Sequence, residues 1–257
     1  MKIGEILSAF AGHHTSAVIL ASGTGSRMKS GTPKQFMMLN GRTVLERSID
    51  AFEQCGYIDD ITLVVPADYI DKVKDMVAYN GFKKIVAVVA GGLTRQESAF
   101  IGMEAIPANA THIAFHDAAR CLVTPDMVSM VTTSAFRTGC SFASFQPKDT
   151  IKLISKSQVT ETKDRQLKRS NLVCASTPQV FKVDIYRAGA YMAKDSGYAA
   201  TDDCSLVEHL GFSCHPVDCG YENMKITTPA DVYTAEFILR ERALQKAEKA
   251  AKKKGDN

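Results

Sequence analysis

The sequence predicts an α/β fold with a mostly parallel central sheet. Short aliphatic runs without charges alternate with longer segments in which apolar residues recur at helical spacing, beginning at residues 17–21. This alternation indicates parallel strands joined by right-handed crossovers, and ligands in such sheets bind beyond the carboxyl ends of the strands. The rhythm breaks at residues 148–173, where a polar, threonine-rich alternating pattern predicts a projecting β-hairpin arm.

The first half of the chain shows the alternation most clearly. The run at residues 17–21 is aliphatic throughout, which is typical of a strand buried on both faces. In chain order we then expect a helix at 43–55 with Thr43 as its N-cap, a strand at 61–65, a helix at 68–79 ended by Asn80-Gly81, and a strand at 84–90.

The second half continues the pattern with clear helix starts. Thr94 and Glu97 fit a capping box, and Thr124-Pro125 opens another helix. We expect strands at 112–115, 141–145 and 213–217, and helices from Thr124 to about residue 137, at 182–194, at 204–210 ended by Gly211, and from Pro229 with Asp231 in the first turn. We also place Lys225 on a strand that returns to the sheet.

Composition restricts the function classes. The chain has 257 residues, 45% of them hydrophobic, and a net charge of +3, which allows a large core and gives no general indication of nucleic acid as a partner. Seven cysteines without a C-x-x-C pair argue against a disulfide framework or a structural zinc site and favour a cytoplasmic location. No apolar run approaches membrane-spanning length, and no signal peptide is evident.

We expect a single domain over most of the chain. It occupies residues 17–240 and includes the arm at about residues 148–173. A lead-in of residues 1–16 precedes it, and a charged, alanine-rich tail of residues 241–257 follows as a solvated, fraying helix end. A nucleic-acid role for the tail lysines is a weak alternative.

A glycine-rich loop after the first strand predicts a phosphate site. Gly23 and Gly25 carry no Cβ, so consecutive backbone N–H groups can turn toward an anion, and Arg27 and Lys34 add two positive charges. These cations suit a reaction in which pyrophosphate leaves. The loop is neither the dinucleotide fingerprint, because Met28 stands where the third glycine belongs, nor a Walker motif. A dehydrogenase is therefore disfavoured.

Two later strand ends bring further polar residues to the same edge. The segment from Gly91 to Ser98 follows one strand, and His116-Asp117-Ala118-Ala119-Arg120 follows another. From the residues alone, the first segment is equally a tight turn before a capped helix. A lone aspartate at a strand end is more often a turn or cap residue than a metal ligand. Arg169, among other basic residues, is by itself most simply a solvated charge.

Seven separated motifs carry a resemblance to a known family. ASGTGSRM followed by TPKQF resembles the signature of the sugar-phosphate nucleotidyltransferases and, within them, of the 2-C-methyl-D-erythritol 4-phosphate cytidylyltransferases. GGLTRQES, HDAAR, DTIK with LKRSNL, STPQ, TDD and KITTP follow in the family's order. Two departures are Cys121, where the family usually has proline, and Ser176, where it usually has glutamine.

The resemblance implies a Rossmann-like nucleotidyltransferase fold, with the arm exchanged across a homodimer. It implies transfer of CMP from CTP to the polyol phosphate, with release of pyrophosphate and with Mg²⁺ or another divalent cation. The implied catalytic residues are Arg27, Lys34, Lys225 and, from the partner, Arg169. The implied nucleotide-binding residues are Ala21, Ser22, Gly23, Gly25, Gly92, Arg95, Ser98 and Ala118. The implied acceptor-binding residues are Asp117, Arg120, Thr150, Thr177, Thr201 and Asp202, with Asp117 also a possible metal ligand.

Two alternatives remain open at this point. A ribitol 5-phosphate cytidylyltransferase resembles the chain in its fold, glycine-rich loop, TPQ and KITTP segments, although DTIK and ATDDCSLVE look closer to the methylerythritol branch. A non-catalytic nucleotide-binding regulator that acts through the arm is the alternative from another class. The presence of both Arg27 and Lys34 argues against it, because simple binding does not need every leaving-group cation.

Overall fold

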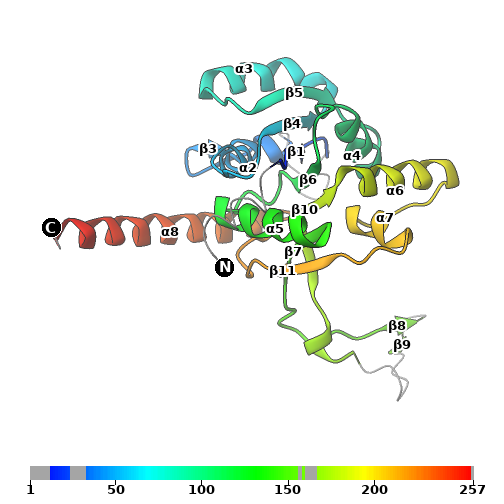
Figure 1. Ribbon diagram of the computed structural model, residues 1–257. Coiled ribbons are helices and arrows are strands. Elements are labelled where there is room, and N and C mark those ends of the chain that lie inside the picture. The colour runs from blue at the N-terminus through cyan, green and yellow to red at the C-terminus, as the bar shows by residue number, and fades with distance from the viewer. Residues whose placement is uncertain (1–11, 24–32, 156–157, 160–166, 256–257) are drawn as a thin grey trace.

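A seven-stranded sheet forms the centre of the protein, with helices on both of its faces (Figure 1). The computed structural model describes residues 12–23, 33–155, 158–159 and 167–255. From one edge to the other, the sheet contains β11 (His215–Asp218), β7 (Cys140–Phe145), β10 (Cys174–Lys182), β6 (His112–Asp117), β1 (Thr15–Leu20), β4 (Asp60–Val65) and β5 (Ile85–Ala90). Neighbouring strands run parallel except that β10 is antiparallel to both β6 and β7. The expected mostly parallel α/β sheet is confirmed.

The helices divide the core into two apolar layers. One layer lies between the sheet and helices α2 (Val44–Glu53), α3 (Ile70–Asn80) and α5 (Pro125–Thr138). The other lies between the sheet and helices α4 (Arg95–Glu104), α6 (Val183–Ser196) and α7 (Asp203–His209). The central strands are buried on both faces as predicted, since every residue of β1, β4 and β6 is buried.

Three helices begin at the capping residues that the sequence predicted. Thr43 and Thr94 each cap a helix through a complete capping box, with Glu46 and Glu97 as the reciprocal acceptors. Thr124 accepts a hydrogen bond from the backbone N–H of Met127 at the start of α5. These caps place the first turns of α2 and α4 next to the carboxyl ends of β1 and β5.

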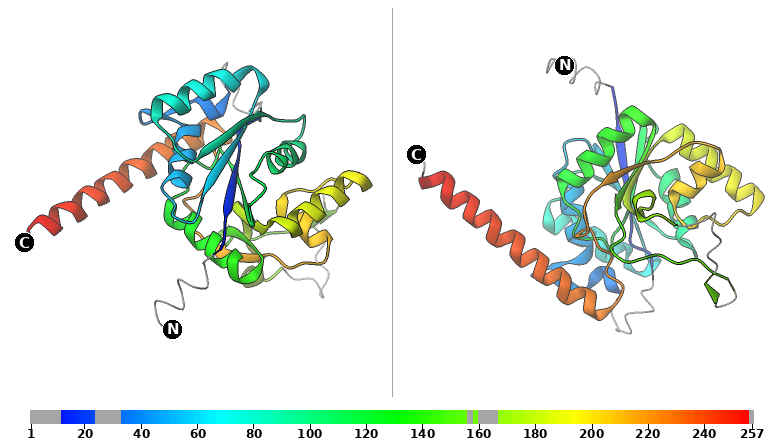
Figure 2. Two further views of the ribbon diagram at one scale, coloured as in Figure 1. Left: turned by 45° about the horizontal axis from the view of Figure 1, so that its top comes forward. Right: turned by 90° about the horizontal axis from the view of Figure 1, so that it is seen from below.

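The expected arm is present and leaves the sheet after β7. Strand β8 (Ile154–Ser155) pairs antiparallel with β9 (Gln158–Val159), followed by the 3₁₀ turn η4 (Arg169–Asn171) before the chain returns through β10. Figures 1 and 2 show this segment extending away from the sheet and its helices. Residues 156–157 and 160–166 of the arm lie outside the described residues.

Three expectations about the second half were incomplete or wrong. The STPQ segment was expected only to re-enter the fold, but it forms the long strand β10, whose Ser176, Thr177 and Gln179 are buried. Lys225 lies on the irregular segment between β11 and α8 (Pro229–Gly255), not on a strand. Helix α8 begins at Pro229 as predicted and continues to Gly255, so the expected domain boundary after residue 240 falls within one helix.

The topology determines where a ligand can bind. The chain passes from β1 to β4 and β5 on one side and then crosses back to add β6 on the other side of β1. Loops after β1, β5 and β6 therefore meet at one edge, and the crevice at such a reversal is the usual ligand site of an open α/β sheet. No helix in the described ranges combines the length and apolar character needed to cross a bilayer.

Candidate active site

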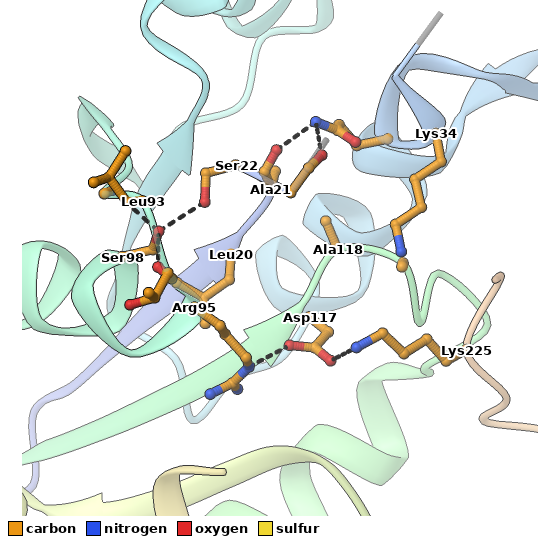
Figure 3. Close-up of a pocket in the computed structure, with 15 residues that line it drawn as sticks. Leu20, Ala21, Ser22, Lys34, Leu93, Arg95, Ser98, Asp117, Ala118 and Lys225 are labelled. Carbon is orange, nitrogen blue, oxygen red and sulfur yellow. Dashed lines mark hydrogen bonds and ion pairs between the residues drawn. The ribbon is translucent and has the colours of Figure 1, made fainter. Parts of the chain in front are cut away.

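A pocket with a cavity volume of about 410 Å³ lies at the carboxyl ends of β1 and β6, beside the loop after β5 (Figure 3). Ten residues expected at the site line it: Ala21, Ser22, Gly23, Lys34, Gly92, Arg95, Ser98, Asp117, Ala118 and Lys225. Segments far apart in the sequence thus meet in one cavity. Gly25 and Arg27 lie outside the described residues, so their expected roles stay predictions.

The side chain of Gln35 fixes the start of the glycine-rich loop. Gln35 lies in the 3₁₀ turn η2 (Lys34–Phe36) and is 2% exposed. Its Nε2 donates to the carbonyl oxygens of Ala21, at 2.6 Å, and Gly23, at 3.2 Å. Both hydrogens of the amide nitrogen are therefore used to hold the loop at the end of β1.

Ser98 connects the loop after β5 to the loop after β1. Its hydroxyl lies 2.9 Å from the hydroxyl of Ser22, accepts from the backbone N–H of Gly92 at 3.1 Å, and donates to the carbonyl of Thr94 at 2.9 Å. A Cβ at Gly91 would lie 2.3 Å from the Cβ of Ser22. Only glycine therefore allows the two loops to approach this closely.

Four charged side chains alternate in sign between the buried core and the wall of the pocket. The Nε of Arg95 donates to Oδ1 of Asp117 at 3.1 Å, and the Nζ of Lys225 donates to Oδ2 of Asp117 at 2.6 Å. On its other side, the Nη2 of Arg95 donates to Oδ2 of Asp203 at 2.7 Å. The hydroxyl of Tyr186 donates to Oδ1 of Asp203 at 2.9 Å. The chain of contacts runs from the core beneath α6 to the pocket.

This arrangement keeps the central pair ionised. Burial alone would raise the pKa of Asp117, but the charges of Arg95 and Lys225 outweigh it and hold that pKa well below its usual value. Burial alone would lower the pKa of Arg95, but the carboxylates of Asp203 and Asp117 raise it. The pocket therefore presents fixed charges at every physiological pH.

Lys225 reaches the pocket because its loop is bonded on both sides. The Nδ2 of the buried Asn223 donates to the carbonyl of Thr177 at 2.8 Å, and the backbone N–H of Ile226 donates to the carbonyl of Ala119 at 2.8 Å. The Nζ of Lys34 lies 3.5 Å from the carbonyl of Ile226. The loop thus brings the ammonium groups of Lys34 and Lys225 to one side of the cavity, as Figure 3 shows.

Arg120 and Thr177 lie next to the pocket and not among the residues that line it. The Nη1 of Arg120 donates to the carbonyl of Asn223 at 3.0 Å, and the hydroxyl of Thr177 accepts from the backbone N–H of Asp117 at 3.1 Å. Cys121 is buried against Leu122 and its neighbours, and burial raises its thiol pKa to about 12. The thiol is therefore a neutral apolar group at the position where the resemblance implied a proline.

The remaining expected acceptor residues are not in this pocket. Asp202 is the N-cap of α7, accepting from the backbone N–H of Ser205 at 3.0 Å, and also accepts from the amide of Gln179 at 2.8 Å. Thr201 is exposed beside it. Thr150 and Arg169 are exposed on the arm, away from the lining residues.

The pocket fits a divalent cation that arrives with substrate phosphates. Among the described lining residues, Asp117 is the one carboxylate, and both of its oxygens already accept from cations. No group of three or more metal-ligating side chains occurs in the part of the chain that the structure describes. Mg²⁺ commonly binds through one or two carboxylates and substrate phosphates, and the single carboxylate here agrees with that pattern.

Sequence reasoning missed three residues that shape the site: Gln35, Asp203 and Asn223. The TDD segment did contain a signal for Asp203, because only one of two adjacent acids can cap a helix. Asp202 takes the cap, and Asp203, 1% exposed, therefore needs another partner. Gln35 and Asn223 carried no local signal, since their partners lie in other segments of the chain.

Comparisons with known proteins agree on one family. The family model described as 2-C-methyl-D-erythritol 4-phosphate cytidylyltransferase matches residues 15–241. The enzyme of that name from Clostridium acetobutylicum is 36% identical over 230 residues, covering 89% of this chain and 99% of the relative. A bifunctional enzyme IspD/IspF from Desulforudis audaxviator is 38% identical, and the chain spans 56% of it.

Solved structures show the same likeness. The crystal structure of 4-diphosphocytidyl-2C-methyl-D-erythritol synthase from Anaerococcus prevotii superposes with a TM-score of 0.80 at 27% identity, covering 91% of this chain and 99% of that one. The 2-C-methyl-D-erythritol 4-phosphate cytidylyltransferase from Thermus thermophilus gives a TM-score of 0.68 at 27% identity, covering 88% and 99%.

Proposed function

The chain belongs to the 2-C-methyl-D-erythritol 4-phosphate cytidylyltransferase family, and from that premise we propose which of its residues carry the family's reaction. The enzyme transfers CMP from CTP to 2-C-methyl-D-erythritol 4-phosphate, giving 4-diphosphocytidyl-2-C-methyl-D-erythritol and pyrophosphate, in non-mevalonate isoprenoid biosynthesis. The observation that supports our assignment of residues is the meeting of Lys34, Arg95 and Lys225 around Asp117 in one cavity.

The nucleotide occupies the part of the pocket between the loops after β1 and β5. Ser22, Gly92 and Ser98 line that part, and Gln35 holds the backbone of the first loop in place. Neutral donors of this kind suit a base and ribose, whereas the N–H groups at the start of a glycine-rich loop suit phosphate. Gly25 and Arg27 extend this phosphate site in our proposal.

The chemical step is an in-line displacement at the α-phosphorus of CTP. An oxygen of the acceptor phosphate forms the new bond to phosphorus, and the bond to the oxygen bridging the α- and β-phosphates breaks, so that pyrophosphate leaves. Lys34 and Arg27 stabilise the charge on the α-phosphate and the leaving group. No covalent enzyme intermediate is needed, because holding two anions together and neutralising them is most of the work.

Asp117 and the phosphates of CTP hold Mg²⁺ in this proposal. Asp117 would share one oxygen that now accepts from Lys225 or Arg95. When bound, the cation neutralises phosphate charge and acts as a Lewis acid. The protein's part is to orient the carboxylate from the end of β6. The seven free cysteines also agree with a reducing cytoplasm as the location.

The acceptor lies on the side of the pocket lined by Lys225, next to which Arg120 and Thr177 lie. Lys225 would leave Asp117 to contact the incoming phosphate, since its ammonium group lies at the pocket wall. Thr201 and Asp202 do not line the pocket, and in our proposal they contact the hydroxyl groups of the polyol. Because their polar atoms are already used in the α7 cap, we assign them the weakest part of acceptor recognition.

The arm completes the site of a second subunit in a homodimer. In the described part of the arm region, four apolar side chains are exposed: Ile151, Leu153, Leu167 and Val173. A hairpin with such side chains is marginal in water unless it packs against something. Thr150 and Arg169 project from the same region and are absent from their own chain's pocket lining, so we assign them to the partner's pocket.

Mixing two inactive variants tests this exchange. Arg169→Ala retains a complete pocket, and Lys34→Ala retains a complete arm, so a mixed dimer contains one intact site. After unfolding and refolding together at equal amounts, about a quarter of wild-type activity should return, because about half of the dimers are mixed and each has one working site. No recovery, with dimers confirmed by light scattering, would place Arg169 outside the partner's site.

The reaction itself is tested by pyrophosphate release from CTP and Mg²⁺, with methylerythritol 4-phosphate and ribitol 5-phosphate in parallel. We expect release with the first acceptor only. Lys34→Ala should reduce kcat by at least 100-fold, in the range seen when one transition-state donor is removed. Lys74→Ala, which removes an exposed lysine of α3, is the matched control. Near-normal turnover of Lys34→Ala would overturn the assignment.

The other outcomes separate the alternatives. Release with ribitol 5-phosphate alone would keep the chemistry and change the acceptor. Binding of CTP without turnover on either acceptor would favour the regulator.

A further inference from the structure

Helix α8 has two faces with different surroundings. Toward the sheet, Ala235 is buried, and Val232, Ile238 and Leu239 pack with it against a small apolar cluster. The Nη1 of Arg242 makes the last of these contacts, donating to the carbonyl of Leu122 at 2.7 Å. Every described side chain from residue 243 to residue 252 is exposed, and Figures 1 and 2 show this half of the helix projecting from the rest of the protein.

The face turned away from the sheet carries a regular apolar seam. Tyr233, Phe237 and Leu244 are 74%, 61% and 53% exposed. Ala247 and Ala251 continue the same line, and Arg240 fills the one intermediate position, so the spacing is four, three, four, three and four residues. We call the six residues the seam. This is the spacing of the a and d positions of a coiled coil.

The seam differs from an ordinary solvated helix face because it exposes two aromatic rings along one line. Aromatic side chains on a helix are normally buried against a partner when they repeat at this spacing. The described side chains of the projecting half, residues 243–252, are also all exposed, and a short helix of alanine and charged residues is marginal in water by itself. Both features are accounted for if a second helix covers the seam.

The charges on α8 indicate which helix covers the seam and in which direction that helix runs. Residues 229–241 contain three acidic side chains and one basic side chain, whereas residues 242–255 contain six basic and one acidic. Two parallel copies of α8 would place the basic halves together. Two antiparallel copies place each basic half beside the partner's acidic half, which is favourable.

We propose that α8 pairs antiparallel with α8 of a second copy of this chain. In the register centred on Arg242, Tyr233 packs against the partner's Ala251 and Phe237 packs against the partner's Ala247. The small alanines let each ring approach the facing helix, and the projecting half of one chain covers the aromatic rings of the other. The helix is about 40 Å long. The sheets and helices of the two chains can therefore lie at opposite ends of the helix pair without clashing.

This contact is independent of the proposed function and of the arm. No seam residue lines the pocket, and the arm leaves the sheet in a different direction from α8 (Figure 1). The family match ends at residue 241, so the projecting half lies outside it. The α8 pairing is therefore a property of this chain. Where the twofold axes of the two contacts cross, the α8 pairing and an arm-mediated dimer together close an assembly of four chains.

The test compares two charge insertions one residue apart. Leu244→Glu places a carboxylate in the seam, and Gln245→Glu places the same charge on an exposed position beside it. Multi-angle light scattering of the full chain should show that Leu244→Glu halves the mass of the wild-type assembly and that Gln245→Glu leaves it unchanged. Pyrophosphate release should equal that of the wild type in both variants, which shows that the fold is intact. An equal mass for wild type and Leu244→Glu, or halving by both variants, overturns the proposal.

Cysteine cross-linking tests the direction of pairing. Under mild oxidation with diamide, the double variant Tyr233→Cys with Ala251→Cys should form a disulfide-linked dimer on a denaturing gel. The single variant Ala251→Cys should not, and the wild-type chain reports the background from its own thiols. A linked dimer from Ala251→Cys alone would show parallel helices and refute the antiparallel arrangement.

Discussion

The carboxylate of Asp203 is the feature of the site whose removal has the most specific expected effect. Asp203 is 1% exposed and accepts from the hydroxyl of Tyr186, which is fully buried, and from Arg95. Asp203→Ala leaves the Tyr186 hydroxyl without an acceptor, at a cost of about 1–3 kcal/mol. The lost Arg95 contact adds about 0–1 kcal/mol, because Arg95 is 32% exposed and keeps Asp117. The free energy of unfolding should therefore fall by about 1–4 kcal/mol.

A double-mutant cycle separates this cause from a general loss of packing. Tyr186→Phe removes the hydroxyl itself, so in the Tyr186→Phe background the Asp203→Ala change leaves no unpaired donor there. The double variant should then be less destabilised than the sum of the single variants by about 1 kcal/mol or more. The assay is urea unfolding followed by circular dichroism, since the chain has no tryptophan. Glu208→Gln removes an exposed charge from the same helix and should change stability by less than about 0.5 kcal/mol.

Steady-state kinetics test whether the contact between Arg95 and Asp203 also matters for CTP binding. Without Asp203, Arg95 loses one of the two carboxylates that fix its guanidinium, and the KM for CTP should rise about tenfold, as expected for a lost hydrogen bond to a charged group. Stability within 0.5 kcal/mol of wild type for Asp203→Ala, or strict additivity in the cycle, would refute the reasoning.

Two further predictions concern the loops and the core. In Gly91→Ala the new methyl would lie 2.3 Å from the Cβ of Ser22, so the serine must move, and calorimetric titration should show at least tenfold weaker CTP binding. Gly56→Ala, where the added carbon meets open space, should bind CTP normally. Burial lowers the pKa of His116 to about 3, whereas the unfolded value is about 6.5. Between these values only the unfolded chain takes up the proton, so stability should fall by about 1.4 kcal/mol per pH unit as pH decreases. His116→Gln should reduce this slope in urea titrations from pH 7 to pH 4.5, and a slope reduced equally by replacing the exposed His215 would contradict the assignment.

Local patterns predicted most of the fold because they act over a few residues. The aliphatic strands, the capping box at Thr43 and the proline at the start of α8 each depend on near neighbours in sequence. Strand β10 was missed because its buried serine, threonine and glutamine side chains are satisfied by partners elsewhere in the fold, such as Asp202 for Gln179. Its sequence therefore lacks the apolar alternation that marks a strand.

The same distinction between local and long-range contacts applies to the candidate site. Most of its lining residues were predicted because they lie in contiguous motifs at strand ends. The pairing of Asp117 with both Arg95 and Lys225 was not, because it joins three separate segments of the chain, 22 and 108 positions apart. Lys225 also reaches the site from a loop rather than a strand, held by contacts of Asn223 that only the folded chain makes.

The carboxylate of Asp117 competes with small anions for the two cations beside it. A cavity with several unpaired cations would collect inorganic phosphate, which is abundant in cells. Here the carboxylate is tethered beside Arg95 and Lys225, so its effective concentration stays high whatever the solution contains. A small anion such as phosphate has to displace this carboxylate, and it makes no other contacts that would compensate for the lost ion pairs. In our proposal CTP also engages the loops around Ser22 and Ser98, so it can displace the carboxylate where inorganic phosphate alone cannot.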